Sequence, residues 1–352
     1  MAVFSRVDFS YGLKRLPLSK PYRLSFATLS EIASVWVRAA DEQGRIGWGE
    51  GVALFGYSDE TEELVFEDVG ALVRRMEGRD TAEAWAVLRE SAHSAAPTAV
   101  SALATALDML SFPVPAAVRF PLATPLSTDV LLEELSMAFE LGLKAGFRHF
   151  KVKVGRDVKK SLAARAWLEE RSLASAGTTL RYDANQAYSE AEALEFCNAM
   201  PIGRNVLWLE QPLHREDWEG MARVCARTGF PLMLDESIYT MEDIRRAADI
   251  GCRAIKLKLF KHPGVRECIR LARFAHELGL KVILGNGVSS DIGNFAEALV
   301  VAECADILEP GAECNGFHKL LQNSVYDGLT VDRGDLVLSG GAGVATLHSP
   351  GD

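Results

Sequence analysis

Short apolar runs that end in an acidic residue recur at nearly even spacing in the middle of this chain. Asp183 ends the run in LRYDAN, Glu210 the run in VLWLEQP and Asp235 the run in LMLDES, at intervals of 27 and 25 residues. A strand, a helix and their two connecting loops need about that length. The spacing therefore predicts consecutive β–α units with an acidic residue at the carboxyl end of each strand.

Lysines end the apolar runs on both sides of these acids. Lys151 and Lys153 lie in HFKVKVG, and Lys256 and Lys258 lie in AIKLKLF. Residues two positions apart on a strand point to the same side. In a parallel barrel the carboxyl ends of the strands meet on one face, where such enzymes carry out their chemistry. We therefore expect carboxylates between lysines that approach from opposite sides of a barrel.

The chain from about Phe120 onward alternates strand and helix patterns. Its eight strand candidates are FPLATPLS, HFKVKV, TLRYDAN, VLWLEQP, PLMLDES, AIKLKLF, KVILGNG and ADILEPG. Eight strands close a parallel barrel. The predicted fold is α/β, with a (β/α)8-type TIM barrel as the catalytic domain over residues 116–325.

The first 115 residues lack this alternation. Two stretches with two-residue hydrophobic alternation come first, and three helical patterns follow, which indicates an α+β domain over residues 1–115. The tail, residues 326–352, has no barrel strand left to supply. We expect it to return to the N-terminal domain and complete it.

Composition narrows the class of partner. The 352 residues are 48% hydrophobic and 24% charged, as in ordinary globular proteins, and the net charge is −10. This charge argues against a nucleic acid or an anionic membrane as partner. No apolar run approaches the roughly 18 residues of a membrane helix. The N-terminus lacks a signal-peptide core, so we expect a cytoplasmic protein. The six cysteines form no CxxC pair and are expected to be free thiols.

Three carboxylates on consecutive strand ends favour a site for Mg²⁺, which prefers oxygen ligands and keeps positions open for substrate. A single acid in such a place often caps the following helix instead. A lysine beside a metal-bound substrate can act as a base, although a lysine at a strand end can also be merely solvated. Such a site would bind a carboxylate, stabilise its enolate and move the α-proton.

These motifs together resemble those of the enolase superfamily, and within it the muconate lactonizing enzyme subgroup. The resemblance rests on GWGEG in the N-terminal domain, the KxK pair, the acids of DAN, EQP and DES, and the lysine on the sixth strand. It implies Mg²⁺ held by Asp183, Glu210 and Asp235. It also implies that Lys153 and Lys258 are opposing bases.

The resemblance assigns further roles. Lys151 tunes the neighbouring base or contacts the substrate carboxylate, and Asn185 and Glu236 support the metal cluster. Glu313, in GAECNG, lies where the muconate enzymes carry a glutamate in a GTE segment and is a candidate substrate-binding residue. Strand seven ends in LGNGVSS, without the histidine of the mandelate racemase branch, which disfavours that branch. Strand eight lacks the Asp-x-Asp motif of the dipeptide epimerases. This absence weakens the hypothesis of a dipeptide epimerase without eliminating it.

Two loops of the N-terminal domain are expected to cover the barrel mouth and contact the substrate. These loops run from Pro17 to Thr28 and from Val52 to Thr61. Their candidate substrate-binding residues are Lys20, Tyr22, Arg23, Phe55 and Tyr57. These side chains are equally typical of ordinary exposed loops.

The expected activity is Mg²⁺-dependent abstraction of the proton α to a carboxylate in a small-molecule substrate. A racemase or epimerase of an amino-acid derivative, or a cycloisomerase, is favoured. A β-elimination enzyme, such as a dehydratase or an o-succinylbenzoate synthase-like lyase, is the main alternative, because one site serves all of these reactions. A barrel that only binds a carboxylate is a further alternative. By analogy with the family, a homo-oligomer is expected.

Overall fold

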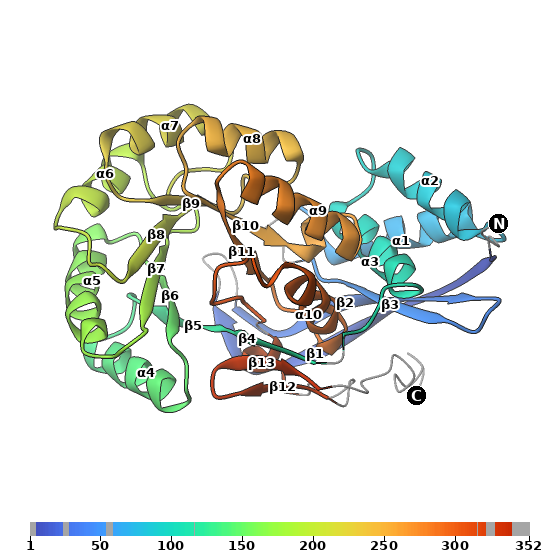
Figure 1. Cartoon of the computed structure of the whole chain (residues 1–352), viewed down its shortest axis with the longest axis horizontal. Coiled ribbons are helices and arrows are strands. Elements are labelled where there is room, and N and C mark those ends of the chain that lie inside the picture. The colour runs from blue at the N-terminus through green and yellow to red at the C-terminus, as the bar shows by residue number, and fades with distance from the viewer. Residues whose placement is uncertain are drawn as a thin grey trace.

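The computed structural model describes residues 5–23, 28–53, 59–115, 117–314, 316–321 and 328–339. The N-terminal part contains an antiparallel sheet in the order β1–β2–β3. Its strands are β1 (Val7–Arg23), β2 (Thr28–Asp41) and β3 (Ile46–Gly51). The helices that follow are α1 (Glu62–Met76), α2 (Thr81–Ser91) and α3 (Pro97–Met109), and they lie beside this sheet in Figure 1.

The glycines of GWGEG bring β3 against α3. A Cβ atom on Gly49 would lie 1.9 Å from the carbonyl oxygen of Ala102, and one on Gly47 would lie 2.0 Å from that of Ala106. Any side chain at these positions would push the helix away from the strand. The motif therefore has a packing role in this part of the molecule.

A curled parallel sheet of seven strands forms the larger part of the fold (Figure 1). In spatial order its strands run from β5 to β11 without interruption. They are β5 (Ala123–Ser127), β6 (His149–Lys153), β7 (Thr179–Asp183), β8 (Val206–Glu210), β9 (Leu232–Leu234), β10 (Ala254–Lys258) and β11 (Lys281–Gly285).

A helix follows each of these strands, and several of them line the outside of the curl in Figure 1. They are α4 (Leu132–Lys144), α5 (Val158–Leu173), α6 (Glu190–Asn198), α7 (Trp218–Arg227), α8 (Met241–Asp249), α9 (Gly264–Glu277) and α10 (Asp291–Cys304). A 3₁₀ turn, η1 (Leu259–Lys261), joins β10 to α9, and a short α11 (Gly316–Lys319) follows residues 308–313.

The eighth predicted strand, ADILEPG, is not a regular strand among the described residues. Its segment makes isolated parallel bridges to both edges of the sheet, from Leu308 to Val282 of β11 and from Ala312 to Leu122 beside β5. Pro310 has no N–H to donate, and Gly311 has φ +94°. These two residues interrupt the ladder while the segment still spans the gap between the edges.

The first predicted strand and the tail also differ from expectation. FPLATPLS divides at Leu122, and its first part belongs to β4 (Val118–Pro121), outside the parallel sheet.

The described part of the tail forms β12 (Leu329–Asp332) and β13 (Asp335–Leu338). They form a sheet in the order β12–β13–β4, so this part pairs with β4 and not with the N-terminal sheet. The burial of Phe120, Leu336 and Leu338 explains this pairing.

A buried carboxylate joins the N-terminal sheet to the larger part. Glu50 of β3 accepts hydrogen bonds from Ser34 Oγ at 2.6 Å, from Ser290 N at 2.9 Å and from Gly293 N at 3.0 Å. The last two donors lie at the N-terminus of α10, so Glu50 caps a helix of the other part. Burial raises the pKa of Glu50, and these hydrogen bonds oppose that shift. The cap fixes the loop that leaves β11.

Replacing Glu50 by glutamine should destabilise the protein by about 1–3 kcal/mol, because an amide NH₂ group would face backbone donors that the carboxylate now satisfies. The midpoint of urea unfolding measures the loss. The matched control is Glu42→Gln, since Glu42 is exposed in the β2–β3 turn. Equal midpoints for the two variants would contradict the capping role of Glu50.

Candidate functional site

The three predicted acids lie side by side at the carboxyl ends of neighbouring strands. Asp183 ends β7, Glu210 ends β8, and Asp235 follows β9 directly. Asp183 pairs in register with Glu210 on one side and with Lys153 of β6 on the other. All three carboxylates are fully buried. The even spacing in the sequence thus corresponds to one row of acids in space.

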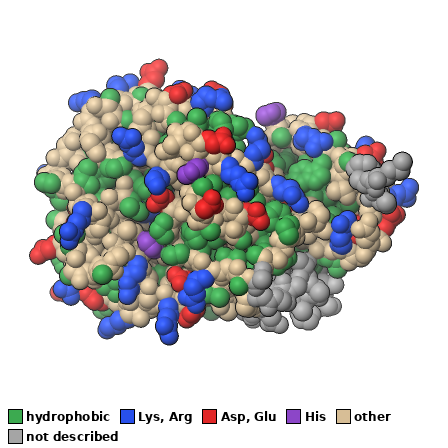
Figure 2. Space-filling model, viewed as in Figure 1, with side chains coloured by type: hydrophobic (Ala, Val, Ile, Leu, Met, Phe, Trp, Pro, Cys, Tyr) green, Lys and Arg blue, Asp and Glu red, His purple; other side chains and the backbone are tan. Residues whose placement is uncertain are grey.

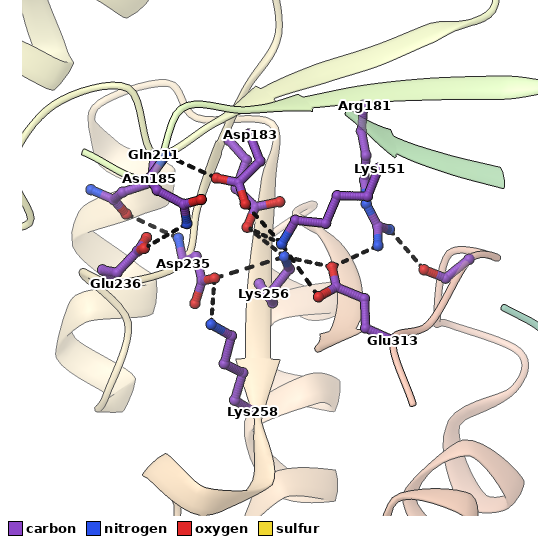
Figure 3. Close-up of polar contacts among 12 residues, drawn as sticks. Lys151, Arg181, Asp183, Asn185, Gln211, Asp235, Glu236, Lys256, Lys258 and Glu313 are labelled. Carbon is purple, nitrogen blue, oxygen red and sulfur yellow. Dashed lines mark hydrogen bonds and ion pairs between the residues drawn. The ribbon is translucent and has the colours of Figure 1, made fainter. Parts of the chain in front are cut away.

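Lys151 lies against this row from β6 (Figure 3). Its Nζ is 2.9 Å from Asp183 Oδ2, 3.1 Å from Glu210 Oε1 and 3.3 Å from Glu313 Oε2. Burial alone lowers the pKa of Lys151, but Asp183 and Glu210 outweigh it and raise that pKa well above its ordinary value. Lys151 is therefore a cation that compensates the acids.

Lys258 approaches the row from the other end. Its Nζ lies 2.7 Å from Asp235 Oδ2, and Lys261 Nζ lies 3.1 Å from Asp235 Oδ1. Burial opposes the charged form of Lys258, but the charge of Asp235 prevails and raises its pKa. Despite burial, Lys258 and Lys261 also help to hold the pKa of Asp235 well below its usual range. Lysines on β6 and β10 thus lie at the two ends of the acid row.

The family resemblance assigns the opposing base to Lys258 rather than to Lys256. In the structure Lys256 is fully buried at the centre of the cluster. Its Nζ forms a close ion pair with Glu210 and lies 2.7 Å from Glu313 Oε1 and 3.7 Å from Asp235 Oδ2. A Cβ atom on Gly285 of β11 would lie 2.4 Å from Lys256 Cδ, so the neighbouring strand leaves room for this lysine.

Arg181 is a second residue that sequence reasoning missed. Its guanidinium donates to Glu313 Oε1 at 2.6 Å and to the carbonyl of Gly311 at 2.8 Å. Arg181 and Asp183 are two positions apart on β7, a signal that was present in LRYDAN. Glu313 itself was predicted to bind substrate, and the structure places it in ion pairs with Arg181, Lys151 and Lys256.

The two predicted supporting residues contact one another. Asn185 Nδ2 donates to Glu236 Oε1 at 3.2 Å, and the backbone N–H of Asn185 donates to Asp183 Oδ1 at 2.9 Å. Gln211 Oε1 accepts from the backbone N–H of Asp235 at 3.0 Å. Asn185 and Gln211 both have positive φ, at 44° and 35°. Positive φ is uncommon for residues other than glycine, although Asn adopts it more readily than most, and such backbone is concentrated at functional sites.

Burial and the charge of Asp183 raise the pKa of Glu210 to about 7, although Lys151 and Lys256 lie against it. Glu210 is therefore the acid of the row that would gain most from a further cation. Its Oε2 and the Oε2 of Glu236 are buried without a hydrogen-bond partner among the described residues.

The donor set fits a hard divalent cation such as Mg²⁺, because it consists of buried carboxylate oxygens, four of which have no hydrogen-bond partner among the described residues. Within the described ranges, no three His, Cys, Asp or Glu side chains are arranged as a metal cage. Ammonium groups of Lys151, Lys256 and Lys258 lie against the carboxylates instead. A bound ion would therefore have to compete with these lysines for the same oxygens.

Replacing Lys256 by methionine should destabilise the metal-free protein by about 3–5 kcal/mol, because Glu210 would lose a buried partner. A divalent cation can supply the missing charge, so Mg²⁺ should raise the Tm of the variant more than that of the original protein. Thermal unfolding in EDTA and in Mg²⁺ measures both effects, with Lys159→Met at an exposed position as control. An equal or smaller Mg²⁺-induced shift would contradict competition between Lys256 and metal.

The predicted specificity loops are only partly described. Residues 17–23 belong to β1 rather than to a loop, and Lys20 is exposed there. Leu18 of the same strand packs with Val288, just after β11, and with Leu320. The side chains of Tyr22 and Arg23, and all of Phe55 and Tyr57, lie outside the described residues.

Basic and acidic side chains are interspersed over the face drawn in Figure 2, and the coloured residues form no continuous basic patch there. Among the described helices, none has both the length and the apolar character needed to cross a bilayer.

Comparisons with known proteins agree with the geometry. Residues 136–346 match the family model described as enolase C-terminal domain-like. The chain is 29% identical over 312 residues to the L-Ala-D/L-Glu epimerase of Bacillus subtilis, covering 83% of each chain. It is 27% identical over 300 residues to the N-succinyl-L-Arg/Lys racemase of Bacillus cereus, covering 80% of each.

The solved structure of muconate lactonizing enzyme from Pseudomonas fluorescens is also similar, with 25% identity and a TM-score of 0.83. The match covers 97% of this chain and 96% of that one. The resemblance inferred from the sequence motifs is thereby confirmed. The chain belongs to the enolase C-terminal domain-like family, within the enolase superfamily.

Proposed function

We propose that this protein is a Mg²⁺-dependent enzyme that removes the proton α to the carboxylate of a small-molecule substrate. Racemisation or epimerisation of an amino-acid derivative, or cycloisomerisation, is the favoured outcome. The observation that carries the proposal is the row of Asp183, Glu210 and Asp235 with Lys153 in register at one end and Lys258 at the other. Related epimerases and racemases support it.

Each residue has a role in this proposal. Asp183, Glu210 and Asp235 would hold Mg²⁺, which when bound supplies positive charge to the substrate carboxylate and so stabilises its enolate. Lys153 takes the α-proton from one face of the substrate, and Lys258 delivers a proton to the other face. Lys151 holds Asp183 and Glu210 in place, and Asn185 orients Glu236 beside them.

The finer architecture is part of the same proposal. Residues 308–313 take the place of the eighth strand of a (β/α)8-type barrel over residues 116–325. Residues 1–115 act as a cap over its mouth, and Lys20, Tyr22, Arg23, Phe55 and Tyr57 are its candidate substrate-binding residues. The bridges of Leu308 and Ala312 to the two sheet edges support this arrangement.

A lyase is the second candidate. An elimination reaction needs only a cation near β10, and Lys258 is a buried cation paired with Asp235 at 2.7 Å. In that case Lys153 alone removes the proton, and a leaving group departs from the neighbouring carbon.

Exchange of α-protons in D₂O with Mg²⁺, followed by mass spectrometry or NMR, tests the proposal. The panel holds dipeptides, N-acyl amino acids, free amino acids, hydroxy acids and lactones. Deuterium should enter at least one compound, and Lys153→Ala should lose exchange for the antipode whose α-proton faces Lys153. Retained Mg²⁺ binding without exchange in any compound would favour a non-catalytic carboxylate-binding protein.

A further inference from the structure

Two of the six cysteines lie against one another between α7 and the amino end of β10. All six are free thiols, as the sequence predicts. Cys225 lies in the last turn of α7, and Cys252 lies between the end of α8 and β10. The two residues are 27 positions apart in the chain, yet their Sγ atoms are 3.8 Å apart. A disulfide bond requires about 2.05 Å, so only a small movement of the two side chains separates these thiols from a bond.

Both cysteines stand on backbone that hydrogen bonds hold in place. Cys225 is part of α7. On the other side, the N–H of Gly251 donates to the carbonyl of Ala248 at 3.0 Å and the N–H of Cys252 to that of Ala247 at 3.1 Å, which closes the end of α8. Gly251 has φ +87°, and a Cβ atom there would lie 3.9 Å from Cys225 Cβ. The turn therefore passes Cys225 within van der Waals contact, and the packing of two fixed elements brings the sulfurs together.

The surroundings distinguish the two thiols. Cys225 is half-buried, whereas Cys252 is buried. The hydrogen bond from Cys252, and to a lesser degree the charge of Arg253, lower the pKa of Cys225 against the effect of burial. The same hydrogen bond and burial raise the pKa of Cys252 well above its ordinary value. Because the thiolate is the reactive form of cysteine, Cys225 is the sulfur that reacts first, with Cys252 held beside it as a thiol.

The other four cysteines lack this combination. Burial raises the pKa of Cys197 to about 12 and that of Cys304 to about 11, and it also raises the pKa values of Cys268 and Cys314. Buried thiols that stay protonated are chemically inert. All six cysteines lie in the described part of the chain, and among them Cys225 alone has a lowered pKa.

We propose that Cys225 and Cys252 form a reversible dithiol–disulfide site for which hydrogen peroxide is the oxidant. The bond joins α7 to the segment that enters β10 and leaves both backbones in place. β10 begins at Ala254 and ends at Lys258, so the pair lies at the end of this strand opposite to the acid row. The site is therefore independent of the reaction proposed above.

The oxidation takes place in two steps. The Cys225 thiolate attacks one peroxide oxygen, the O–O bond breaks, and the departing hydroxide takes up a proton to become water, which leaves a sulfenic acid on Cys225. The sulfur of Cys252 then attacks the sulfur of Cys225, the S–O bond breaks, and the hydroxide leaves as a second water with the proton from Cys252. Two thiols are oxidised to one disulfide, and one peroxide is reduced to two waters.

Peptide mapping of the full chain tests the proposal. Trypsin places Cys225 in residues 224–227, Cys252 in residues 247–253 and Cys197 in residues 182–204, so each possible link has its own mass. The reduced, folded protein is treated with a small excess of hydrogen peroxide, alkylated and digested without reductant. The peptides with Cys225 and Cys252 should be recovered linked, and dithiothreitol should separate them. A link from Cys225 to Cys197, a link that forms only in urea, or oxidation of Cys225 without any link would overturn the proposal.

Single substitutions test the roles of the two sulfurs. Cys252→Ser lacks the second thiol, so it should accumulate sulfenic acid on Cys225, which dimedone traps. Cys225→Ser should give no dimedone adduct at Cys252. The matched control is Cys197→Ser, which removes a buried thiol of α6 and should form the link as the original protein does. Equal labelling of Cys252 in Cys225→Ser would contradict the assignment of Cys225 as the reacting sulfur.

Thermal unfolding tests whether the bond closes without distortion. The oxidised protein should melt at least about 2 °C above the reduced protein, because a closed loop between the two cysteines restricts the unfolded chain. Cys225→Ser after the same treatment should show no such rise. An equal or lower Tm of the linked protein would contradict a bond that leaves α7 and β10 in place.

Discussion

A Glu210→Gln variant is expected to lose Mg²⁺ binding and α-proton exchange together and to unfold more easily. Glu210 is the middle acid of the row and is fully buried. Its Oε1 pairs with Lys256 and lies 3.1 Å from Lys151 Nζ, while its Oε2 has no hydrogen-bond partner among the described residues. Glutamine removes the charge that both lysines and a metal require.

The expected loss of stability is about 3–5 kcal/mol, as for other buried ion pairs broken on one side, because two ammonium groups lose their shared carboxylate. Exchange should fall by at least ~10², since the enolate would lose metal stabilisation. Mn²⁺ binding followed by electron paramagnetic resonance measures the loss of metal binding, and urea unfolding in EDTA measures the loss of stability. Glu219→Gln on the exposed face of α7 is the matched control, because among the described residues its only ion pair is 4.0 Å long. An unchanged Mn²⁺ affinity in Glu210→Gln would remove Glu210 from the proposed metal ligands.

The acid row could be read from the sequence because local periodicity determines it. Each acid ends a short apolar run, and the intervals between runs match one β–α unit, so strand ends and their order follow without knowledge of distant contacts. Lys151 and Lys153 are two positions apart, as are Lys256 and Lys258, so each pair could be placed on one face of its strand. The burial of all three acids and the contacts of Lys151 agree with that reading.

Features that depend on long-range pairing could not be read in this way. The pairing of β13 with β4 joins residues more than two hundred positions apart, and nothing local in either segment identifies its partner. The interruption at Pro310 and Gly311 was visible, but the bridges that still hold the segment depend on both sheet edges. The central place of Lys256 depends on the room left by Gly285 of the neighbouring strand. The sequence of β10 alone therefore could not show that Lys256, and not Lys258, lies at the centre of the cluster.

A large loss of activity is also expected when Lys258 is replaced, and its form separates the two candidate reactions. If the protein is a racemase or epimerase, each lysine serves one face of the substrate. Lys258→Met should then lower interconversion of the antipodes by about 10²–10⁴, the usual contribution of a general acid or base. One antipode should still exchange its α-proton through Lys153. Lys153→Met should show the reverse, with exchange confined to the other antipode.

Lys258→Arg sharpens the distinction, because it keeps the positive charge beside Asp235 but cannot act as a base at ordinary pH. An elimination reaction needs this charge and should survive the change, whereas epimerisation needs a proton to move at Nζ and should not. Chiral separation of the products after reaction in D₂O measures interconversion, and their mass reports any lost group. Exchange of both antipodes in Lys258→Met would contradict the two-base arrangement. Survival of elimination in Lys258→Arg would assign the site to the lyases, because only there is a fixed cation at the end of β10 sufficient.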